Sequence, residues 1–311
     1  MRYRVHHETS YLYGYDVAHS HHLLHLVPRP GPYQQCVEHT LDVAPVAYRR
    51  RDEVDAFGNL VTRLEVDHVH RQLDVAAQMD VEVYIRPKVA PAESHPWERV
   101  RDDLDYHSRP PPRGALEACR FRHESPHVRV KQVLTDHGED CFTKGRPILV
   151  AAEALMDKLH RDLTYAPGET TIATPVMEVL ENRRGVCQDF AHLMIGCLRS
   201  RGLAARYVSG YLRTNPLTLP SPPVTGERVP KAGEGALVGA GASHAWVAVY
   251  SPPFGWIELD PTNDTRVGMD HIAIAWGRDF GDVSPLRGVI LGGGTHQLSV
   301  RVTVEAVTTP S

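Results

Sequence analysis

The sequence predicts an α+β protein, in which a small β-sandwich domain precedes a core of helices packed on an antiparallel sheet. In the first part of the chain apolar and polar residues alternate, as they do in half-buried antiparallel strands. Apolar residues then recur at helical spacing, and short β-branched and aromatic segments follow them. We therefore expect a β-rich domain at 1–88, a linker that wraps the surface at 89–140, and the core at 141–311.

In the N-terminal domain the alternation predicts four strands, at 2–15, 36–43, 60–66 and 73–85. Segments rich in Pro, Gly and Asn separate them, and such residues favour tight reversals of the chain. After the last strand the pattern gives way to Pro, His and charged residues, which indicates a linker.

In the core the helical spacing predicts three helices, at 148–163, 175–182 and 186–201, the last ending at Gly202. Four strands are expected after them, at 205–212, 244–250, 256–259 and 297–304. Residues 214–242 are rich in Pro, Gly and Thr without periodicity, which predicts an inserted loop.

Composition excludes several function classes. The apolar fraction of 42% and charged fraction of 23% are those of a globular protein. A formal net charge of −4 offers no basic field for nucleic acid. The start of the chain lacks the apolar run of a secretory signal, and no window of about 18 apolar residues suits a membrane span. We therefore expect a cytoplasmic protein that binds neither nucleic acid nor a membrane.

The cysteines and the short motifs predict neither a metal nor a cofactor. The five cysteines are scattered without a CxxC pair, so neither a disulfide framework nor a zinc site is expected. No Gly-rich phosphate loop or EF-hand loop occurs. The histidines within 19–25 suit several metal geometries and require none, so we interpret them as part of a strand or loop.

Cys187 is the candidate nucleophile. It follows Gly185-Val186 at the start of a predicted helix, where unpaired N–H groups and the helix dipole favour a thiolate. Gly185 would leave room for a substrate to approach the sulfur. Cys197, on the apolar face of the same helix, reads as an inert core thiol.

His244 and Asp260 are the candidate base and its orienting carboxylate. His244 starts a predicted strand, and Asp260 ends the next one, so a hairpin can bring them together. His192 is a rival base, but five positions along a helix turn it about 140° away from Cys187, which favours packing or hydrogen bonding. Asp189 reads as a negative charge at the helix N-terminus.

Four core segments, GVCQDFAHL, RYVSGYL, SHAWVAVY and GWIELDPTND, resemble in order and spacing those of bacterial transglutaminase-like proteins of the cysteine protease type. HHLLHLVPRP and DAFGN resemble the β-rich domain that precedes the catalytic core in that family. The resemblance implies a papain-like core with Cys187, His244 and Asp260 as its catalytic triad. The 214–242 segment departs from the family pattern, just before the histidine strand.

The resemblance also implies acyl transfer. A thiolate would attack an amide carbonyl and form a thioester, which water or a primary amine then resolves. Hydrolysis of a peptide or protein substrate is the first hypothesis, protein-glutamine crosslinking the second, and a non-catalytic binding scaffold the third. The backbone N–H of Cys187 would help to hold the oxyanion, and Tyr165, Gln188 and Trp246 are candidates for a second donor or for shaping the site. The sequence leaves the oligomeric state open.

Overall fold

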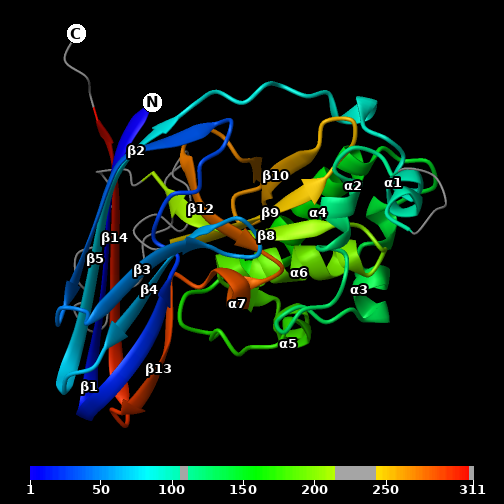
Figure 1. Cartoon of the computed structure of the whole chain (residues 1–311). Coiled ribbons are helices and arrows are strands. Elements are labelled where there is room, and N and C mark those ends of the chain that lie inside the picture. Colours follow the sequence, from blue (N-terminus) through cyan, green and yellow to red (C-terminus); the bar gives the residue numbers. More distant parts are fainter. Residues whose placement is uncertain (106–110, 214–242, 308–311) are drawn as a thin grey trace.

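The computed structural model describes residues 1–105, 111–213 and 243–307. A β-sheet domain built from both ends of the chain lies beside a core of helices and a second sheet (Figure 1). The predicted loop at 214–242 lies outside the described residues.

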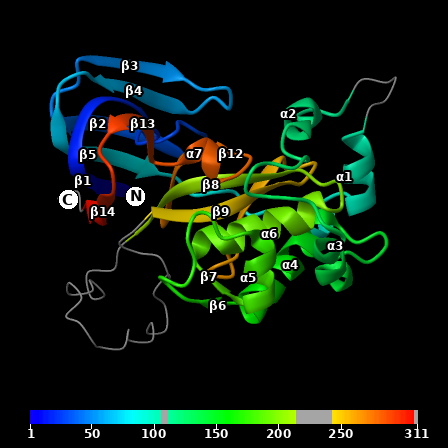
Figure 2. The same cartoon turned by 90° about the horizontal axis from the view of Figure 1, so that it is seen from below.

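Seven strands form the sheet of the first domain. They are β1 (Arg2–Leu24), β2 (Gln34–Ala44), β3 (Arg49–Val54), β4 (Leu60–Val66), β5 (His70–Val83), β13 (Leu286–Gly292) and β14 (His296–Val307). The first half of β1 pairs with β5 and β14, and its second half pairs with β4 and β13. Because the two halves of β1 pair with different strands, β3 and β4 lie in a different layer from β2 and β5 (Figure 2).

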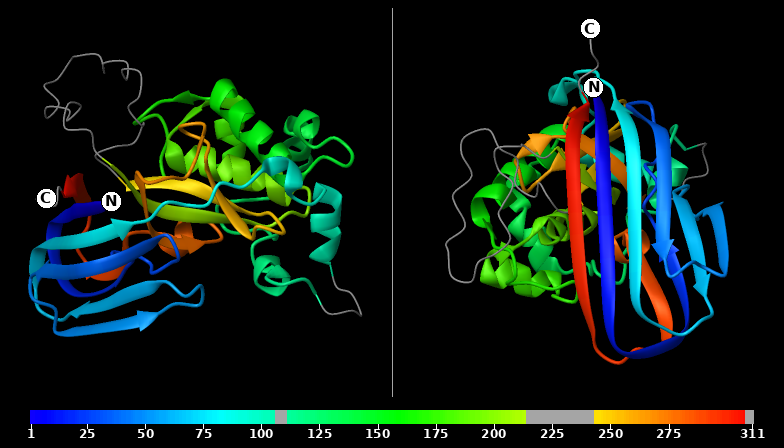
Figure 3. Two further views of the ribbon diagram at one scale, coloured as in Figure 1. Left: turned by 90° about the horizontal axis from the view of Figure 1, so that it is seen from above. Right: turned by 90° about the vertical axis from the view of Figure 1, so that its left-hand side faces the viewer.

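The strands β13 and β14 differ from the predicted domain boundaries. The sequence analysis assigned residues 286–307 to the core, but both strands run antiparallel to β1 in the N-terminal sheet. The right-hand view of Figure 3 shows β14 beside β1 along its length. Alternation identifies a strand, but it carries no information about which sheet the strand joins, since pairing is set by distant residues.

The segment 84–141 leads from the sheet domain to the core and contributes short helices to it. These are η1 (Pro91–Glu93), α1 (Trp97–Asp103), α2 (Ala115–Cys119), α3 (Gln132–His137) and η2 (Glu139–Cys141). Val100, Phe121 and Leu134 of this segment are fully or almost fully buried in the main apolar cluster. The segment is therefore more than a surface linker, because its apolar side chains complete the core.

The core joins helices to a five-stranded sheet in the order β11-β10-β9-β8-β12, with every pair antiparallel. Its helices are α4 (Ile148–Asp162), α5 (Val176–Asn182), α6 (Cys187–Arg199) and α7 (Phe280–Val283). Its sheet strands are β8 (Ala205–Leu212), β9 (Ser243–Tyr250), β10 (Trp256–Asp260), β11 (Thr265–Arg266) and β12 (His271–Gly277). A short parallel pair, β6 (Thr164–Tyr165) with β7 (Arg184–Gly185), precedes α6.

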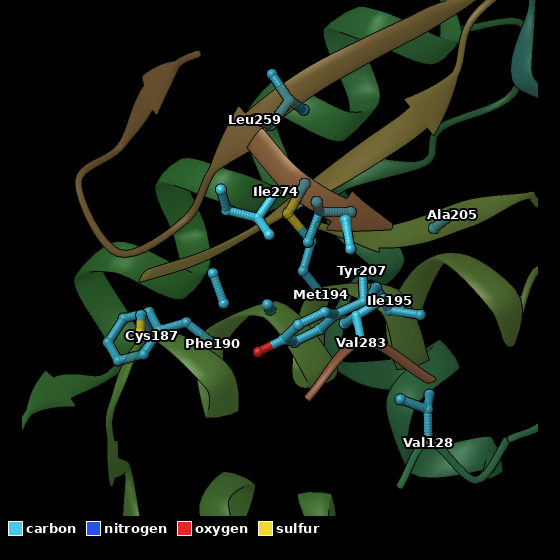
Figure 4. Packing of buried hydrophobic residues seen from close by; sticks show 14 of the residues in the cluster. Val128, Cys187, Phe190, Met194, Ile195, Ala205, Tyr207, Leu259, Ile274 and Val283 are labelled. Atoms are coloured by element: carbon cyan, nitrogen blue, oxygen red, sulfur yellow. The ribbon is translucent and has the colours of Figure 1, made fainter. Parts of the chain in front are cut away.

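Helix α6 packs on β8 and β9, and this contact positions the predicted nucleophile. Phe190, Met194 and Ile195 belong to the buried cluster that also takes Tyr207 and Ile274 from the strands (Figure 4). Burial of such side chains contributes roughly 1.5–3 kcal/mol each, so the start of the helix is held firmly against the sheet.

Two buried side-chain amides of the N-terminal domain bind the edge strand β12. Gln34 donates to the carbonyl of Ala273 at 2.6 Å and accepts from its N–H at 2.8 Å. Asn59 likewise donates to the carbonyl of Trp276 at 2.8 Å and accepts from its N–H at 3.0 Å. Each amide thus occupies the place of a peptide group of a neighbouring strand.

Candidate active site

Cys187 is the first residue of α6, and its side chain is 9% exposed. The Asp189 carboxylate accepts hydrogen bonds from the Val186 N–H at 2.8 Å and from the Thr170 hydroxyl at 2.6 Å, which fixes this helix start. A Cβ on Gly185 would lie 2.7 Å from Asp189 side-chain atoms. The glycine therefore makes room for this carboxylate, and its role in the approach of a substrate stays a prediction.

The sheet brings His244 and Asp260 together and places the start of β9, with His244, beside the thiol. The Nε2 of His244 lies 2.8 Å from Oδ2 of Asp260, and the two residues are 1% and 0% exposed. The Cys187 sulfur lies 4.0 Å from the carbonyl oxygen of Ser243, the residue before His244. The Nδ1 of His244 is buried and has no hydrogen-bond partner among the described residues, so it is the nitrogen available to the thiol.

Electrostatics favour a charged imidazole in this setting. Burial lowers the pKa of His244, but the negative charges of Asp260 and Cys187 more than offset this and raise it to about 10. Burial would raise the pKa of Asp260, yet the charge and hydrogen bonds of His244, with His271, hold it well below its usual range. A carboxylate and an imidazolium are thus the stable forms of the pair.

Five donors from the part of the chain that the structure describes surround the Asp260 carboxylate. Its Oδ1 accepts from the backbone N–H groups of Thr262 at 3.0 Å and Asn263 at 3.3 Å. Its Oδ2 accepts from His244, from the Asn263 amide at 2.7 Å and from His271 Nε2 at 3.2 Å. Asn263 and His271 were not among the predicted site residues, although Asn263 belongs to the DPTND end of the segment GWIELDPTND and could have been found there.

Comparisons with known proteins agree with this geometry. Residues 3–82 match the bacterial transglutaminase-like N-terminal region, and residues 139–261 match the transglutaminase-like superfamily. An uncharacterized protein of Mycobacterium tuberculosis is 36% identical over 313 residues, which cover 98% of this chain and 92% of that one. The chain belongs to the transglutaminase-like superfamily.

One further sequence relative and one solved structure have names that describe an activity. A protein-glutamine gamma-glutamyltransferase of Pseudomonas aeruginosa is 27% identical over 205 residues, which are 65% of this chain and 26% of that protein. The crystal structure of a "Putative Cysteine Protease" from Cytophaga hutchinsonii has a TM-score of 0.71 at 17% identity and covers 100% of this chain and 92% of its own. This second likeness shows the shared fold.

Two tyrosines lie near the thiol of this transglutaminase-like core. Burial and the negative charge of Cys187 raise the pKa of Tyr165, in β6, to about 12. The same two causes raise the pKa of the fully buried Tyr207, in β8, well above its ordinary value. Both phenols therefore keep their protons. Tyr165 was predicted near the thiol; Tyr207 was not, since it reads as an ordinary strand residue.

The other two predicted site-shaping residues take different positions. Gln188 is half-buried in the first turn of α6, directly after the nucleophile. Trp246 is fully buried, and its Nε1 donates to Glu258 at 2.7 Å. Its ring lies 6.1 Å from the ring of His244 and 5.3 Å from that of His271. Trp246 therefore supports the imidazoles from inside the sheet and does not line a groove.

The rival residues have structural roles. The buried His192 accepts a hydrogen bond from the Phe280 N–H at 3.1 Å and stacks on His127 with ring centres 5.6 Å apart. Burial lowers the pKa of His192 to about 3, so it packs as a neutral ring. Burial raises the pKa of Cys197 to about 12, as expected for an unreactive core thiol.

The histidines within 19–25 are the other group of possible ligands in the sequence. The histidine-rich segment lies on β1 and just after it, where His22 and His25 are buried. The side-chain nitrogen and oxygen atoms of His19, His21 and Glu65 lie within 4.8 Å of one another, and the closest are the Nε2 atoms of the two histidines at 2.9 Å.

Among the described residues, no helix is long and apolar enough to cross a membrane.

Proposed function

We propose that this superfamily member is a Cys-His-Asp acyl-transfer enzyme that hydrolyses a peptide or amide bond. The observation that carries the proposal is the buried imidazole of His244, whose Nε2 binds the Asp260 carboxylate at 2.8 Å while Nδ1 stays available to Cys187. This is the relation between base and orienting carboxylate that nucleophilic catalysis requires.

The chemistry follows from the charges of the pair. With the pKa of His244 raised to about 10, the imidazole can hold the proton that the thiol gives up, and the deprotonated sulfur is the form that attacks. The thiolate attacks the carbonyl carbon, and the imidazolium then protonates the leaving amine, so that a thioester and a free amine result. Water attacks the thioester with neutral His244 as base, which releases the acid.

The oxyanion of the tetrahedral intermediate needs donors near the sulfur. The backbone N–H of Cys187 belongs to the first turn of α6, where N–H groups lack intrahelical partners. Tyr165 keeps its proton near the thiol and is our candidate for the second donor. Loss of one such donor typically costs about 10²–10³ in rate.

Transamidation is the second candidate, because the related Pseudomonas protein is named a protein-glutamine gamma-glutamyltransferase. Both reactions share the thioester and differ in the acceptor. Incubation with a glutamine-containing peptide and a labelled primary amine separates them. Ammonia release with incorporated amine supports transamidation, whereas a new carboxylate without incorporation supports hydrolysis.

The triad is tested by iodoacetamide labelling of the five thiols between about pH 5 and about pH 9, resolved by peptide mass spectrometry. Fast labelling of Cys187 at about pH 6, slowed in His244→Ala, is expected. Cys197 is the internal control, since burial raises its pKa to about 12. Labelling of Cys187 no faster than that of Cys36 and Cys119 would contradict the proposal.

A further inference from the structure

A second buried histidine binds the same carboxylate oxygen that holds His244. His271 is the first residue of β12, is 3% exposed, and places Nε2 at 3.2 Å from Oδ2 of Asp260. The ten residues between Asp260 and His271 lead the chain from β10 to the far edge strand of the sheet. The contact therefore joins two strands that are not neighbours.

The hydrogen bonds of His271 define its tautomer. Its Nδ1 lies 3.4 Å from the backbone N of Gly268, and a backbone N–H can only donate. Nδ1 is therefore the acceptor, and the ring proton of the neutral imidazole is on Nε2. His271 is thus a donor to Asp260, as His244 is.

Packing holds the ring of His271 in this orientation. The indole of Trp246 meets it edge-on, with ring centres 5.3 Å apart and planes at 86°. The space for the indole comes from Gly210, where a Cβ would lie 2.3 Å from a Trp246 ring carbon and 2.2 Å from the carbonyl oxygen of Ile272. No larger residue fits at position 210 without displacing the strand that carries His271.

The backbone beside His271 is fixed by both parts of the molecule. Asp270 accepts a hydrogen bond from the Tyr3 hydroxyl of β1 at 3.3 Å and pairs with Arg213 at 3.1 Å. Two residues after His271, Ala273 is bound by Gln34 of the N-terminal domain. The N-terminal sheet therefore fixes the start of β12, and through it the donor to Asp260.

We propose that His271 is a positioning residue, whose Nε2–H keeps Oδ2 of the Asp260 carboxylate aimed at His244. The inference rests on the proposed triad and adds a fourth side chain to it. The ionisable groups that face Asp260 are His244 from β9 and His271 from β12, with Cys187 of α6 behind His244. From α4, His160 binds the carbonyl of Thr262 at 3.0 Å.

Loss of this donor has a defined consequence for the pH profile. Without the donor at Oδ2 the carboxylate can turn away from Nε2 of His244, and a weaker partner makes the imidazolium, and with it the thiolate, less stable. The acid limb of the Cys187 alkylation profile, which is the range where the rate falls as the pH is lowered, should move up by about one pH unit. Below that limb, alkylation at a fixed pH should fall about tenfold.

Three variants separate the donor from the bulk of the ring. His271→Gln keeps an N–H group at a reach similar to that of Nε2, and its acid limb should stay near that of the parent. His271→Met fills a similar volume without a donor and should show the shift. His271→Asn keeps an amide that is one methylene too short to reach Asp260, so its acid limb should shift as in His271→Met. This variant provides the test if His271→Met folds poorly.

Circular dichroism and thermal melting identify the folded variants before labelling. A role limited to packing would lower the melting temperature and leave the limb in place. An unmoved limb in folded His271→Met or His271→Asn would therefore overturn the inference, as would a shift of equal size in His271→Gln. If Cys187 of the parent is labelled no faster than the other thiols, the proposed triad falls, and this inference falls with it; the parent alone decides that outcome.

Discussion

Replacing Asp260 with asparagine should reverse the proton arrangement of the site while changing its shape very little. An asparagine amide group has one oxygen and one NH₂ group where the carboxylate has two acceptors. The backbone N–H groups of Thr262 and Asn263 face Oδ1 and cannot turn away. The asparagine oxygen should therefore take this place, which points its NH₂ group at Nε2 of His244.

His244 must then accept at Nε2 and carry its proton on Nδ1, toward Cys187. In that tautomer it cannot take the proton of the thiol. The charge of Asp260 helps to raise the pKa of His244 from 6.5 to about 10. Because one pKa unit is a tenfold change in proton affinity, its loss should reduce the thiolate–imidazolium population by up to about 10³-fold.

The assay is the rate of Cys187 alkylation at about pH 6, with turnover once a substrate is known. Asp264→Asn is the matched control, since the same chemical change occurs four positions away on an exposed side chain. We expect a loss of about 10³-fold in Asp260→Asn and parental rates in the control. A folded Asp260→Asn protein with the parental alkylation rate would refute the reasoning.

Three further predictions concern activity and stability. Cys187→Ala should abolish turnover and leave the urea midpoint nearly unchanged, and residual turnover would exclude Cys187 as nucleophile. The buried His7 is bonded to Tyr211 at 2.8 Å, and burial lowers its pKa to about 4. The unfolded chain therefore binds the proton first, and the free energy of unfolding should fall as the pH drops from about 6.5 to about 4. Urea titrations of His7→Gln should show a shallower fall, and an equal slope would contradict this. The buried Arg199 guanidinium donates hydrogen bonds to three backbone carbonyls. Arg199→Ala should lower the free energy of unfolding in urea by about 3–5 kcal/mol. A loss under about 1 kcal/mol would show that these hydrogen bonds do not stabilise the fold.

Much of the core could be predicted because its signals are local. The predicted helix at 148–163 is observed as α4 (Ile148–Asp162), and the one at 186–201 as α6 (Cys187–Arg199). Helical spacing and the glycine at 202 depend on neighbouring residues only. Cys187, His244 and Asp260 come together as predicted because the helix start and one hairpin suffice to bring them there.

The remainder depended on contacts between distant parts of the chain. β3, β12 and β13 were not predicted, and β14 was placed in the wrong sheet. His271 reads in the sequence as the first residue of an apolar segment, and only the folded chain brings it within 3.2 Å of Asp260. The close approach of the Asp189 side chain to Gly185 was not predicted either, because a sequence does not show how a side chain folds back on the chain.

The amides of Gln34 and Asn59 also cover part of an edge of the core sheet. An uncovered edge strand presents free N–H and C=O groups that can recruit a strand from another molecule. Here two side chains from the N-terminal part of the chain bind the backbone of β12 at Ala273 and Trp276. The N-terminal domain thus covers part of the β12 edge, where free N–H and C=O groups could otherwise pair with a strand of another molecule.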